Sequence, residues 1–419
     1  MMKDKLQQLL DEYQQNYNKF TYGHYLDPDN IEDAIKTGLV GCFYLDKAYK
    51  PEKRQAIGQV LALYDKYWGD KLQFGYIDGD PNKLFPYQQT SLYEKINQIN
   101  GVGADNICFY WSNVNNIDFV PEYMLNVYSR AEWYEELHKE ISNVQFYLPI
   151  NELKSFGVDS LVELIRQISE ILQPMHGFFG LGIQHSHEYY DYQYLEYELA
   201  HKYLGLDISN DEADEHLRDG FKCINWLTIL SDQLVTDKLG SLDELKQRNQ
   251  DEAITFYPYK GGVVVRAGEV PELGDVSRNP YPKHYVNVNA LLKPARAPEI
   301  GSLGFGSING EIRFDNNTSK AWQCRFDNIT ATDYFDNNED VSAEVISINS
   351  AQHISIQTGQ PCPHTGLYST NIDGKIQYRK LIGGYIVEPF IDSNTKQTYT
   401  DITWTLLRRD DGGSVYIKN

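Results

Sequence analysis

The chain has 419 residues, of which 41% are hydrophobic and 23% charged, a globular composition that excludes disorder or a collagen-like repeat as a global description. Its 38 basic and 59 acidic residues give a net charge of −21 at pH 7, which disfavours binding to nucleic acid and favours a basic partner. This length predicts roughly two or three domains.

The cysteine content and the first residues bear on where the protein works. Five cysteines, widely spaced and odd in number, do not match a disulfide framework and are typical of a reducing compartment. The first residues lack the apolar segment of a signal peptide, and no run approaches the roughly 18 apolar residues of a membrane helix. We therefore expect a soluble, cytoplasmic protein that does not bind a membrane.

Helical and strand patterns alternate along most of the chain. Apolar residues at helical spacing predict a helix over 3–18, within an N-terminal helix and linker at 1–35. A first series of strands and helices covers residues 39–45, 51–68, 72–77, 90–99, 106–111 and 123–127. A second series in the same order covers residues 142–148, 158–172, 177–183, 190–203, 221–230 and 262–267. The pattern predicts an α+β domain over 36–314, built from strand–helix–strand units duplicated over 36–135 and 140–310, with mixed or antiparallel sheets.

The chain changes character near residue 315. Short runs of β-forming residues then alternate with turn-forming clusters such as Asp336-Asn337-Asn338. These runs cover residues 342–348, 354–356, 384–387 and 399–407. We therefore predict a small all-β domain over residues 315–419, which is a usual size for a domain.

The densest negative charge lies between residues 188 and 219, where tyrosines are interleaved with the acidic side chains. Such a run is ordinarily a solvated surface. A docking face for a basic protein would instead use the carboxylates for attraction and the tyrosines for contact area. Both interpretations stay open at this stage. The candidate partner-binding residues are Glu188, Tyr190, Asp191, Tyr194, Asp207, Asp211, Glu212, Asp214 and Glu215.

Two places combine residue types that bind metals. His185 and His187, with Asp191 nearby, have the spacing that puts two ligands on one side of a strand. Cys362 and His364 form a second pair, but their spacing is not that of a zinc finger, and the neighbouring prolines and glycines indicate a rigid turn. Because short ligand patterns are weak indicators, we expect no metal and no cofactor.

Known enzyme signatures are absent from the sequence. The chain has no GxSxG elbow, no GxxxxGK[ST] phosphate-binding loop, no HExxH motif and no GxGxxG motif after a strand. We therefore assign no catalytic residue, although catalytic groups are assembled in space and a motif search does not find all of them.

The stretch from Arg266 to Asp275 has the pattern of a structural framework. It predicts a strand that leaves the core, a turn at 271–274, and a return strand over 285–292. Arg266 and Glu269 have the spacing to pair across the turn, and Asp275 to cap it. An Arg/Glu/Asp set more often forms structural ion pairs than a catalytic site.

Several short runs stand in a characteristic order along the chain. They are GFFGLG at 177–182, YLGLDI at 203–208, INWLTILSD at 224–232, the stretch 266–275, and ALLKPAR at 290–296. Over residues 35–300 the chain resembles the type VI immunity family, formerly a domain of unknown function, with Leu204 where proline is usual. A further run, GQPCPHTG at 359–366, is similar to a C-terminal module of other polymorphic-toxin immunity proteins, with Leu367-Tyr368 where tryptophan is usual.

The resemblance implies structural roles for the recurrent residues of these runs and no catalytic role. These residues are Trp226, Arg266, Gly268, Glu269, Pro271, Gly274, Asp275, Pro361, Cys362, Pro363 and Gly366.

The resemblance also implies an antitoxin, a non-enzymatic immunity protein that binds and neutralises a cognate type VI toxin in the cytosol. The composition agrees, because toxins that act on nucleic acid are commonly basic, and an acidic, tyrosine-rich surface suits occlusion of an active or substrate-binding site. Two alternatives stay open. One is a metal-dependent hydrolase centred on His185, His187 and Asp191, and the other is an adaptor that loads an effector onto a secretion machine. The sequence indicates no oligomeric state.

Overall fold

The computed structural model describes most of the chain. The described residues are 2–15, 35–77, 84–88, 105–117, 119–187, 193–208, 215–275, 281–304, 314–329, 354–372, 375–391 and 397–409. The chain divides into two compact units, the first holding residues 1–305 and 314–335 and the second holding residues 306–313 and 336–419. The described helices all belong to the first unit, and the described part of the second unit is built from strands.

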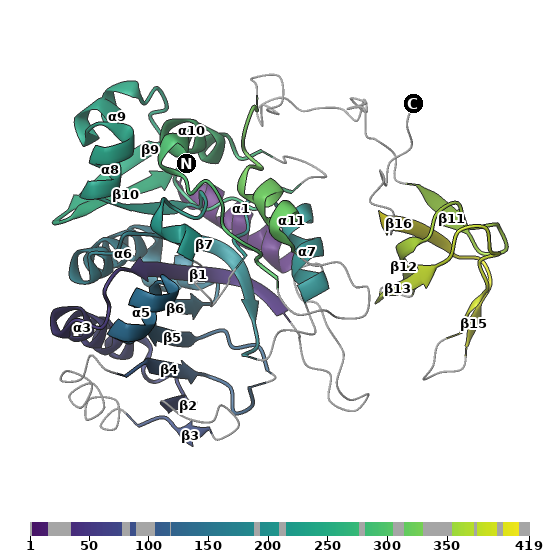
Figure 1. Ribbon diagram of the computed structural model, residues 1–419, viewed down its shortest axis with the longest axis horizontal. Coiled ribbons are helices and arrows are strands. Elements are labelled where there is room, and N and C mark those ends of the chain that lie inside the picture. The colour runs from purple at the N-terminus through teal and green to yellow at the C-terminus, as the bar shows by residue number, and fades with distance from the viewer. Residues whose placement is uncertain are drawn as a thin grey trace. The chain divides into compact units, whose positions relative to one another are not determined.

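An antiparallel sheet forms the centre of the first unit (Figure 1). Its ten described strands lie in the order β3-β2-β4-β5-β6-β1-β7-β8-β10-β9, and each neighbouring pair is antiparallel. Strand β1 lies between β6 and β7, so Leu39 is paired with both Leu148 and Leu181. The strands are β1 (Ile35–Leu45), β2 (Phe74–Ile77), β3 (Phe85–Pro86), β4 (Ile107–Ser112), β5 (Met124–Ser129), β6 (Ser142–Leu148), β7 (His176–His185), β8 (Leu227–Ser231), β9 (Ile254–Tyr259) and β10 (Gly262–Ala267).

Strand β7 is the buried, glycine-rich central strand that the sequence predicts. A Cβ atom on Gly180 would lie 2.1 Å from Oδ1 of Asn225, so no side chain fits there. Asn225 in turn donates from Nδ2 to the carbonyl of Leu181 at 3.0 Å. Glycine is therefore required where the segment carrying Asn225 closely approaches the strand.

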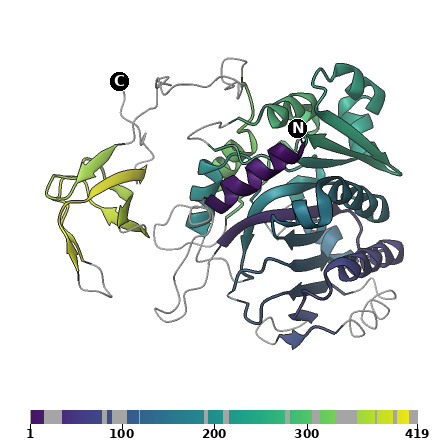
Figure 2. The same cartoon turned by 180° about the vertical axis from the view of Figure 1, so that it is seen from behind.

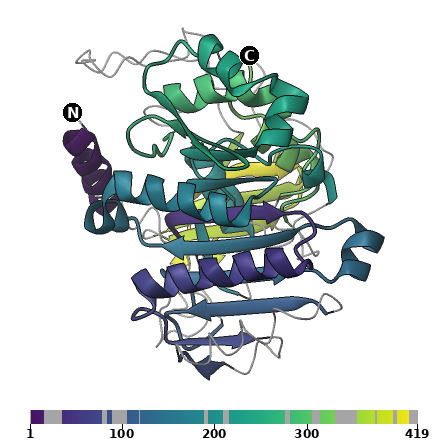
Figure 3. The same cartoon turned by 90° about the vertical axis from the view of Figure 1, so that its left-hand side faces the viewer.

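Two long helices lie side by side on one face of the sheet (Figure 3). They are α3 (Pro51–Trp68) and α6 (Val158–Leu172), and both have the bounds that the sequence predicts. Pro51 stands at the start of α3, where its missing N–H group removes no helical hydrogen bond. The apolar stripe of α6 is buried, and each such leucine or isoleucine stabilises the fold by about 1.5–3 kcal/mol.

The opposite face of the sheet carries a second apolar cluster. Along β1, Leu39 and Phe43 join the core beneath α3 and α6, whereas Val40 and Tyr44 point the other way and join the second cluster. Trp322 belongs to this second cluster. The other helices are α1 (Met2–Gln15), α5 (Glu132–His138), α7 (Gln193–Lys202), α8 (Asp232–Leu239), α9 (Leu242–Arg248), α10 (Lys283–Leu292) and α11 (Asn316–Gln323), with short turns η1 (Leu153–Gly157), η3 (Glu215–Arg218) and η4 (Lys293–Ala295).

The N-terminal helix α1 is packed on the first unit (Figure 2). Its Leu9 and Leu10 are buried, and the hydroxyl of Tyr13 donates to the carbonyl of Thr37 at 2.8 Å. Among the described residues, no helix combines the length and the apolar character that a membrane crossing requires.

The second unit contains two small antiparallel sheets. Four strands lie in the order β11-β16-β12-β13, and β14 pairs with β15. Tyr368, Trp404 and Leu406 are fully buried in its core. The strands are β11 (Ser355–Gln357), β12 (Gly366–Ile372), β13 (Lys375–Leu381), β14 (Phe390–Ile391), β15 (Thr398–Tyr399) and β16 (Thr403–Arg409).

The predicted fold class is confirmed: the protein is α+β, its sheets are antiparallel, and small sheets occupy the C-terminal region. The predicted helix at 90–99 and strand at 342–348 lie outside the described residues. The duplication over 36–135 and 140–310 and the boundary at 314/315 stay predictions. Helix α11 lies beyond that boundary, in the span predicted as all-β, and it packs within the first unit through Trp322.

Two predicted strands are wrong. Residues 285–292 form helix α10, because Tyr285, Val288 and Leu292 recur at helical spacing and are all buried. Residues 384–387 form no strand, since Gly384 has a φ of +85° and only an isolated bridge joins Ile386 to Pro361.

His176, at the start of β7, makes stability depend on pH. Burial lowers its pKa from 6.5 to about 4, and its Nε2 donates to the carbonyl of Leu217 at 2.8 Å. Between these pH values the unfolded chain binds the proton that the folded protein excludes. Stability is therefore complete above pH 6.5 and is lost as the pH falls toward 4, by about 3 kcal/mol.

Urea unfolding between pH 7 and pH 4 measures this effect. The variant His176→Gln lacks the titrating group and is expected to show a flatter pH dependence than the natural chain. Equal slopes for the two proteins would contradict this role of His176.

Candidate functional site

Three of the residues assigned structural roles, Trp226, Arg266 and Gly268, lie together in one cluster. Trp226 is fully buried, and its Nε1 donates to the carbonyl of Gly268 at 3.3 Å. The guanidinium of Arg266 lies 5.5 Å from the centre of a Trp226 ring and donates from Nε to the same carbonyl at 3.0 Å. Gly268 has a φ of +84°, which favours glycine. This cluster joins the end of β10 to the segment before β8.

Arg266 is bonded differently from its predicted pairing with the carboxylate of Glu269. It donates to the backbone carbonyl of Glu269 and, at 3.1 Å, to Oδ1 of Asp159. The Glu269 carboxylate pairs instead with Lys5 of α1 at 3.3 Å. The cluster therefore also holds α1 and α6 to the framework.

The turn at 271–275 is joined by the backbone to the family-like run that begins at Tyr203. The amide of Leu204 donates to the carbonyl of Gly274 at 2.9 Å, and Asp275 forms an isolated bridge with Tyr203. These contacts are structural, and they bring two of the quoted runs together.

The Pro361–Gly366 run forms a turn between β11 and β12. The amide of Cys362 donates to the carbonyl of Tyr385 at 2.8 Å, and its thiol donates to the carbonyl of His364 at 3.1 Å. Tyr368 donates to the same carbonyl at 2.8 Å. The similarity of this run to a C-terminal immunity module stays a prediction.

Most of the predicted partner-binding side chains lie outside what the structure describes, so their role stays a prediction. They are Glu188, Tyr190, Asp191, Tyr194, Asp211, Glu212, Asp214 and Glu215.

Asp207 is described, and it lies inside the protein, contrary to its assignment to a docking face. It is fully buried and accepts from Nζ of Lys222 at 2.9 Å and from Sγ of Cys223 at 2.6 Å. Burial acts to lower the pKa of Lys222, but the charge of Asp207, its hydrogen bond and the neighbouring thiols together outweigh burial and raise that pKa. The carboxylate is internal because a buried ammonium group requires a counter-charge.

The two candidate metal-binding histidines approach tyrosines instead. Nε2 of His187 lies 3.1 Å from the hydroxyl of Tyr76, and Nε2 of His185 lies 3.5 Å from that of Tyr147. Asp191 lies outside the described residues. Across the described part of the chain, no three His, Cys, Asp or Glu side chains form a group that could hold a metal ion.

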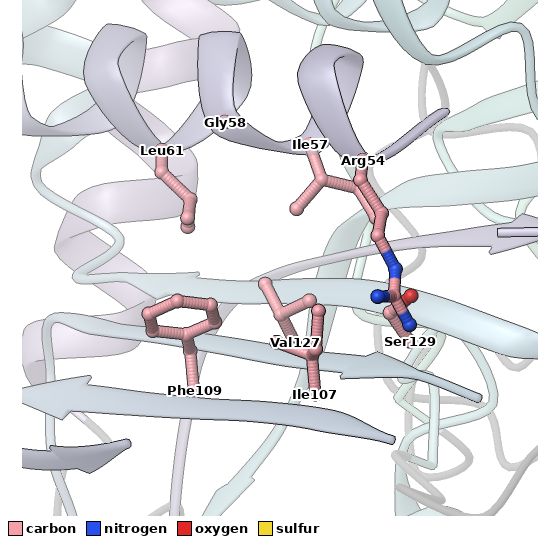
Figure 4. A pocket seen from close by; sticks show the side chains of 8 residues that line it. All are labelled: Arg54, Ile57, Gly58, Leu61, Ile107, Phe109, Val127 and Ser129. Carbon is pink, nitrogen blue, oxygen red and sulfur yellow. The ribbon is translucent and has the colours of Figure 1, made fainter. Parts of the chain in front are cut away.

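A small cavity lies between α3 and strands β4 and β5 (Figure 4). Its walls are mostly apolar, with Leu61 and Phe109 at one end and Arg54 at the other. Arg54 donates from Nη2 to the carbonyl of Asp105 at 2.5 Å. Among the described lining residues there is no carboxylate, thiol or imidazole, and the hydroxyl of Ser129 donates to the carbonyl of Ala48 at 3.2 Å.

A surface at one end of the sheet combines carboxylates with exposed apolar side chains. Helix α5 connects β5 to β6 and projects beyond the strand ends, where it is the short blue helix of Figure 3. Trp133 is 56% exposed and Leu137 is 70% exposed, one helical turn apart on the same side. Burial and the charges of the α5 glutamates raise the pKa of the neighbouring Tyr49. The α5 surface consists of Tyr49, Glu132, Trp133, Glu136 and Leu137.

Arg218 of η3 fastens α5 to the body of the first unit. It donates to Oδ1 of Asp46 at 2.7 Å, to Oε1 of Glu135 at 2.8 Å, and to the carbonyls of Lys139 at 2.5 Å and Glu140 at 3.0 Å. Burial raises the pKa of Glu135 despite Arg218. Burial also acts to raise the pKa of Asp46, but the hydrogen bonds from Arg218 and Glu135 and the nearby positive charges together hold it below its usual value. Arg218 lies within the predicted acidic segment between residues 188 and 219, and these bonds bring this one residue of the segment against α5.

A second set of contacts fixes the two ends of α5. The backbone amide of Ala131 donates to Oδ1 of Asn106 at 2.7 Å. Arg130 pairs with Glu140 at 2.7 Å and lies 4.9 Å from the ring centre of Tyr134. Helix α5 is therefore held in place by charged and aromatic contacts, while Trp133 and Leu137 project outward.

The α5 surface was missed by the sequence analysis. Its signal is the run EWYEELHKE at 132–140, in which aromatic and acidic residues alternate between two predicted strands. A seven-residue helix has too few turns for an apolar periodicity to reveal which side is exposed.

The comparison with protein families identifies the class of protein to which this chain belongs. The family model described as "Type VI immunity for VRR-NUC" (TsiV) matches residues 56–326, which is more than half of the chain. The chain therefore belongs to this type VI immunity family, and the predicted resemblance is confirmed.

The comparison with solved structures gives a similar fold. A Pseudomonas aeruginosa T6SS protein, PA0821, is 23% identical with a TM-score of 0.66, and the match covers 75% of this chain and 88% of that one. The comparison with curated proteins gave no match.

Proposed function

We propose that the partner of this immunity protein is a VRR-NUC effector, which acts as a nuclease. The immunity protein binds this effector in the cytosol and neutralises it. The observation that carries the proposal is the family match over residues 56–326, which begins in α3 and ends just after α11. It therefore takes in most of the sheet together with the Trp226–Arg266 framework.

The charge of the chain supports this partner. A nuclease binds a polyanion and so presents cationic side chains around its substrate-binding site. A protein with a net charge of −21 attracts such a surface at long range and associates with it rapidly at low salt. Occlusion of the substrate-binding site by acidic and aromatic side chains is the mode of inhibition that we propose.

The reading frame next to this gene provides the test. Its product is expressed in a bacterium with and without this protein, and survivors and intact plasmid DNA are measured. We expect rescue by the immunity protein and a stable complex of the two purified proteins. A catalytically inactive variant of the neighbouring product controls for toxicity that does not depend on its activity.

Two other results would redirect the proposal. A complex that forms without rescue would favour the effector-loading adaptor. Rescue without a complex would favour an enzyme that reverses or degrades the product of the toxin. A neighbouring product that is not toxic, or whose toxicity this protein does not relieve, would overturn the proposal.

A further inference from the structure

We propose that the α5 surface is the interface that docks a cationic surface of the toxin, with Trp133 and Leu137 as its apolar anchors. This inference rests on the proposed function and adds the place of contact. To the contact predicted for the segment between residues 188 and 219 it adds a short helix whose position the structure defines.

The exposure of the two anchors is the first argument. Trp133 and Leu137 are four positions apart on one helix, so their exposed side chains lie next to each other as one apolar ridge. Single exposed apolar residues are common, but an exposed tryptophan beside an exposed leucine and a tyrosine is typical of an interface. Tryptophan is also the residue type most enriched among those that dominate binding energy.

The support beneath the helix is the second argument. Arg218 bonds to Asp46 and Glu135, and Arg130 bonds to Glu140, so the buried side of α5 is held by charge-assisted hydrogen bonds. The ridge is therefore already in position before binding, and little side-chain and loop ordering is needed on association.

The negative charge of the α5 surface indicates that its partner is cationic. Glu132 and Glu136 are exposed beside the ridge, and among the described residues neither forms an ion pair. Of the nearby cations, Arg218, Arg130 and Lys47 pair with other carboxylates, whereas Lys50 and Lys139 are exposed. Lysine or arginine side chains of a partner would meet two carboxylates and the face of Trp133, which also favours cations.

Other occupants fit this surface less well. Two copies of the chain joined through α5 would bring the carboxylates of Glu132 and Glu136 together in a region of like charge. A nucleic acid would be repelled by the same carboxylates and by the net charge of −21. A cationic protein surface satisfies both the apolar ridge and its acidic border.

The test measures the dissociation constant of the full-length protein for the catalytically inactive toxin. We expect Trp133→Ala to weaken binding by about 30-fold and Trp133→Ala/Leu137→Ser by about 100-fold or more. We expect Glu132→Lys/Glu136→Lys to slow association chiefly at low salt. A matched control is Phe85→Ser, which removes another exposed aromatic side chain, 60% exposed on strand β3, and is expected to leave binding unchanged.

The outcomes separate this inference from the function on which it rests. Tight binding by the natural chain and unchanged binding by the α5 variants would overturn the inference and leave the proposed function standing. A natural chain that does not bind the toxin would overturn both. Loss of self-association in the variants, measured by analytical ultracentrifugation, without loss of toxin binding would assign the ridge to a second copy and overturn the inference.

Discussion

Replacing Asp207 by alanine is expected to lower the free energy of unfolding by about 3–5 kcal/mol. The carboxylate is fully buried and faces a buried ammonium group, that of Lys222, at 2.9 Å. Its removal leaves the Lys222 charge in the interior without a counter-charge. Guanidinium unfolding of the full-length protein at pH 7 measures the loss.

The double variant Asp207→Leu/Lys222→Met separates the ion pair from the site as a whole. It removes both charges and fills the space with apolar atoms, so it is expected to recover most of the stability that the single variant loses. Exposed Asp237 on α8 supplies the control, because Asp237→Ala should change stability by less than about 0.5 kcal/mol. If Asp207→Ala were as stable as Asp237→Ala, the assignment of a buried ion pair between Asp207 and Lys222 would be contradicted.

Replacing Trp226 by alanine is expected to destabilise the first unit by about 3–5 kcal/mol. Its side chain is fully buried, packs against Phe179 with ring centres 6.1 Å apart, and supports Arg266 and the carbonyl of Gly268. The variant leaves a cavity at the point where β10 meets the segment before β8.

The variant Trp226→Phe divides this loss into packing and hydrogen bonding. It keeps an aromatic ring against Phe179 but lacks the N–H group that donates to Gly268, and it should lose about 1 kcal/mol for that bond. The loss is limited because Arg266 still donates to the same carbonyl. Trp133→Ala removes an exposed tryptophan and is expected to leave stability nearly unchanged, and equal losses at the two tryptophans would contradict these assignments.

The two stability predictions and the α5 test address different parts of the first unit. Asp207 and Trp226 are interior residues whose loss acts through unfolding, whereas Trp133 and Leu137 are exposed and act through the partner. A variant of the α5 surface that remains as stable as the natural chain but loses the toxin would therefore report on recognition alone.

The long periodic elements and the family were predictable from the amino-acid sequence. Helices 51–68 and 158–172 have the predicted bounds because one side of each is a continuous apolar stripe, and that stripe is written locally. The glycines of β7 and the order of the family-like runs were equally local signals, and the net charge of −21 pointed to a basic partner.

The pairing of the strands and the burial of individual side chains depended on contacts between residues that are distant in the sequence. Nothing near β1 in the sequence indicates that it pairs with both β6 and β7, and nothing near Asp207 indicates that Lys222 makes it internal. Residues 285–292 were misread as a strand although Tyr285, Val288 and Leu292 recur at helical spacing, and the burial of these side chains identifies the helix.

The same distinction between local sequence signals and contacts of distant residues applies to the α5 surface. Its acidic and aromatic composition was visible in the chain, but its location was not, because α5 is short and gains its position from Arg218, which is far away in the sequence. A short helix is not stable through local propensity alone. Charge and periodicity therefore came from the sequence, whereas the exposure of Trp133 and Leu137 came from the tertiary contacts that bury the other side of their helix.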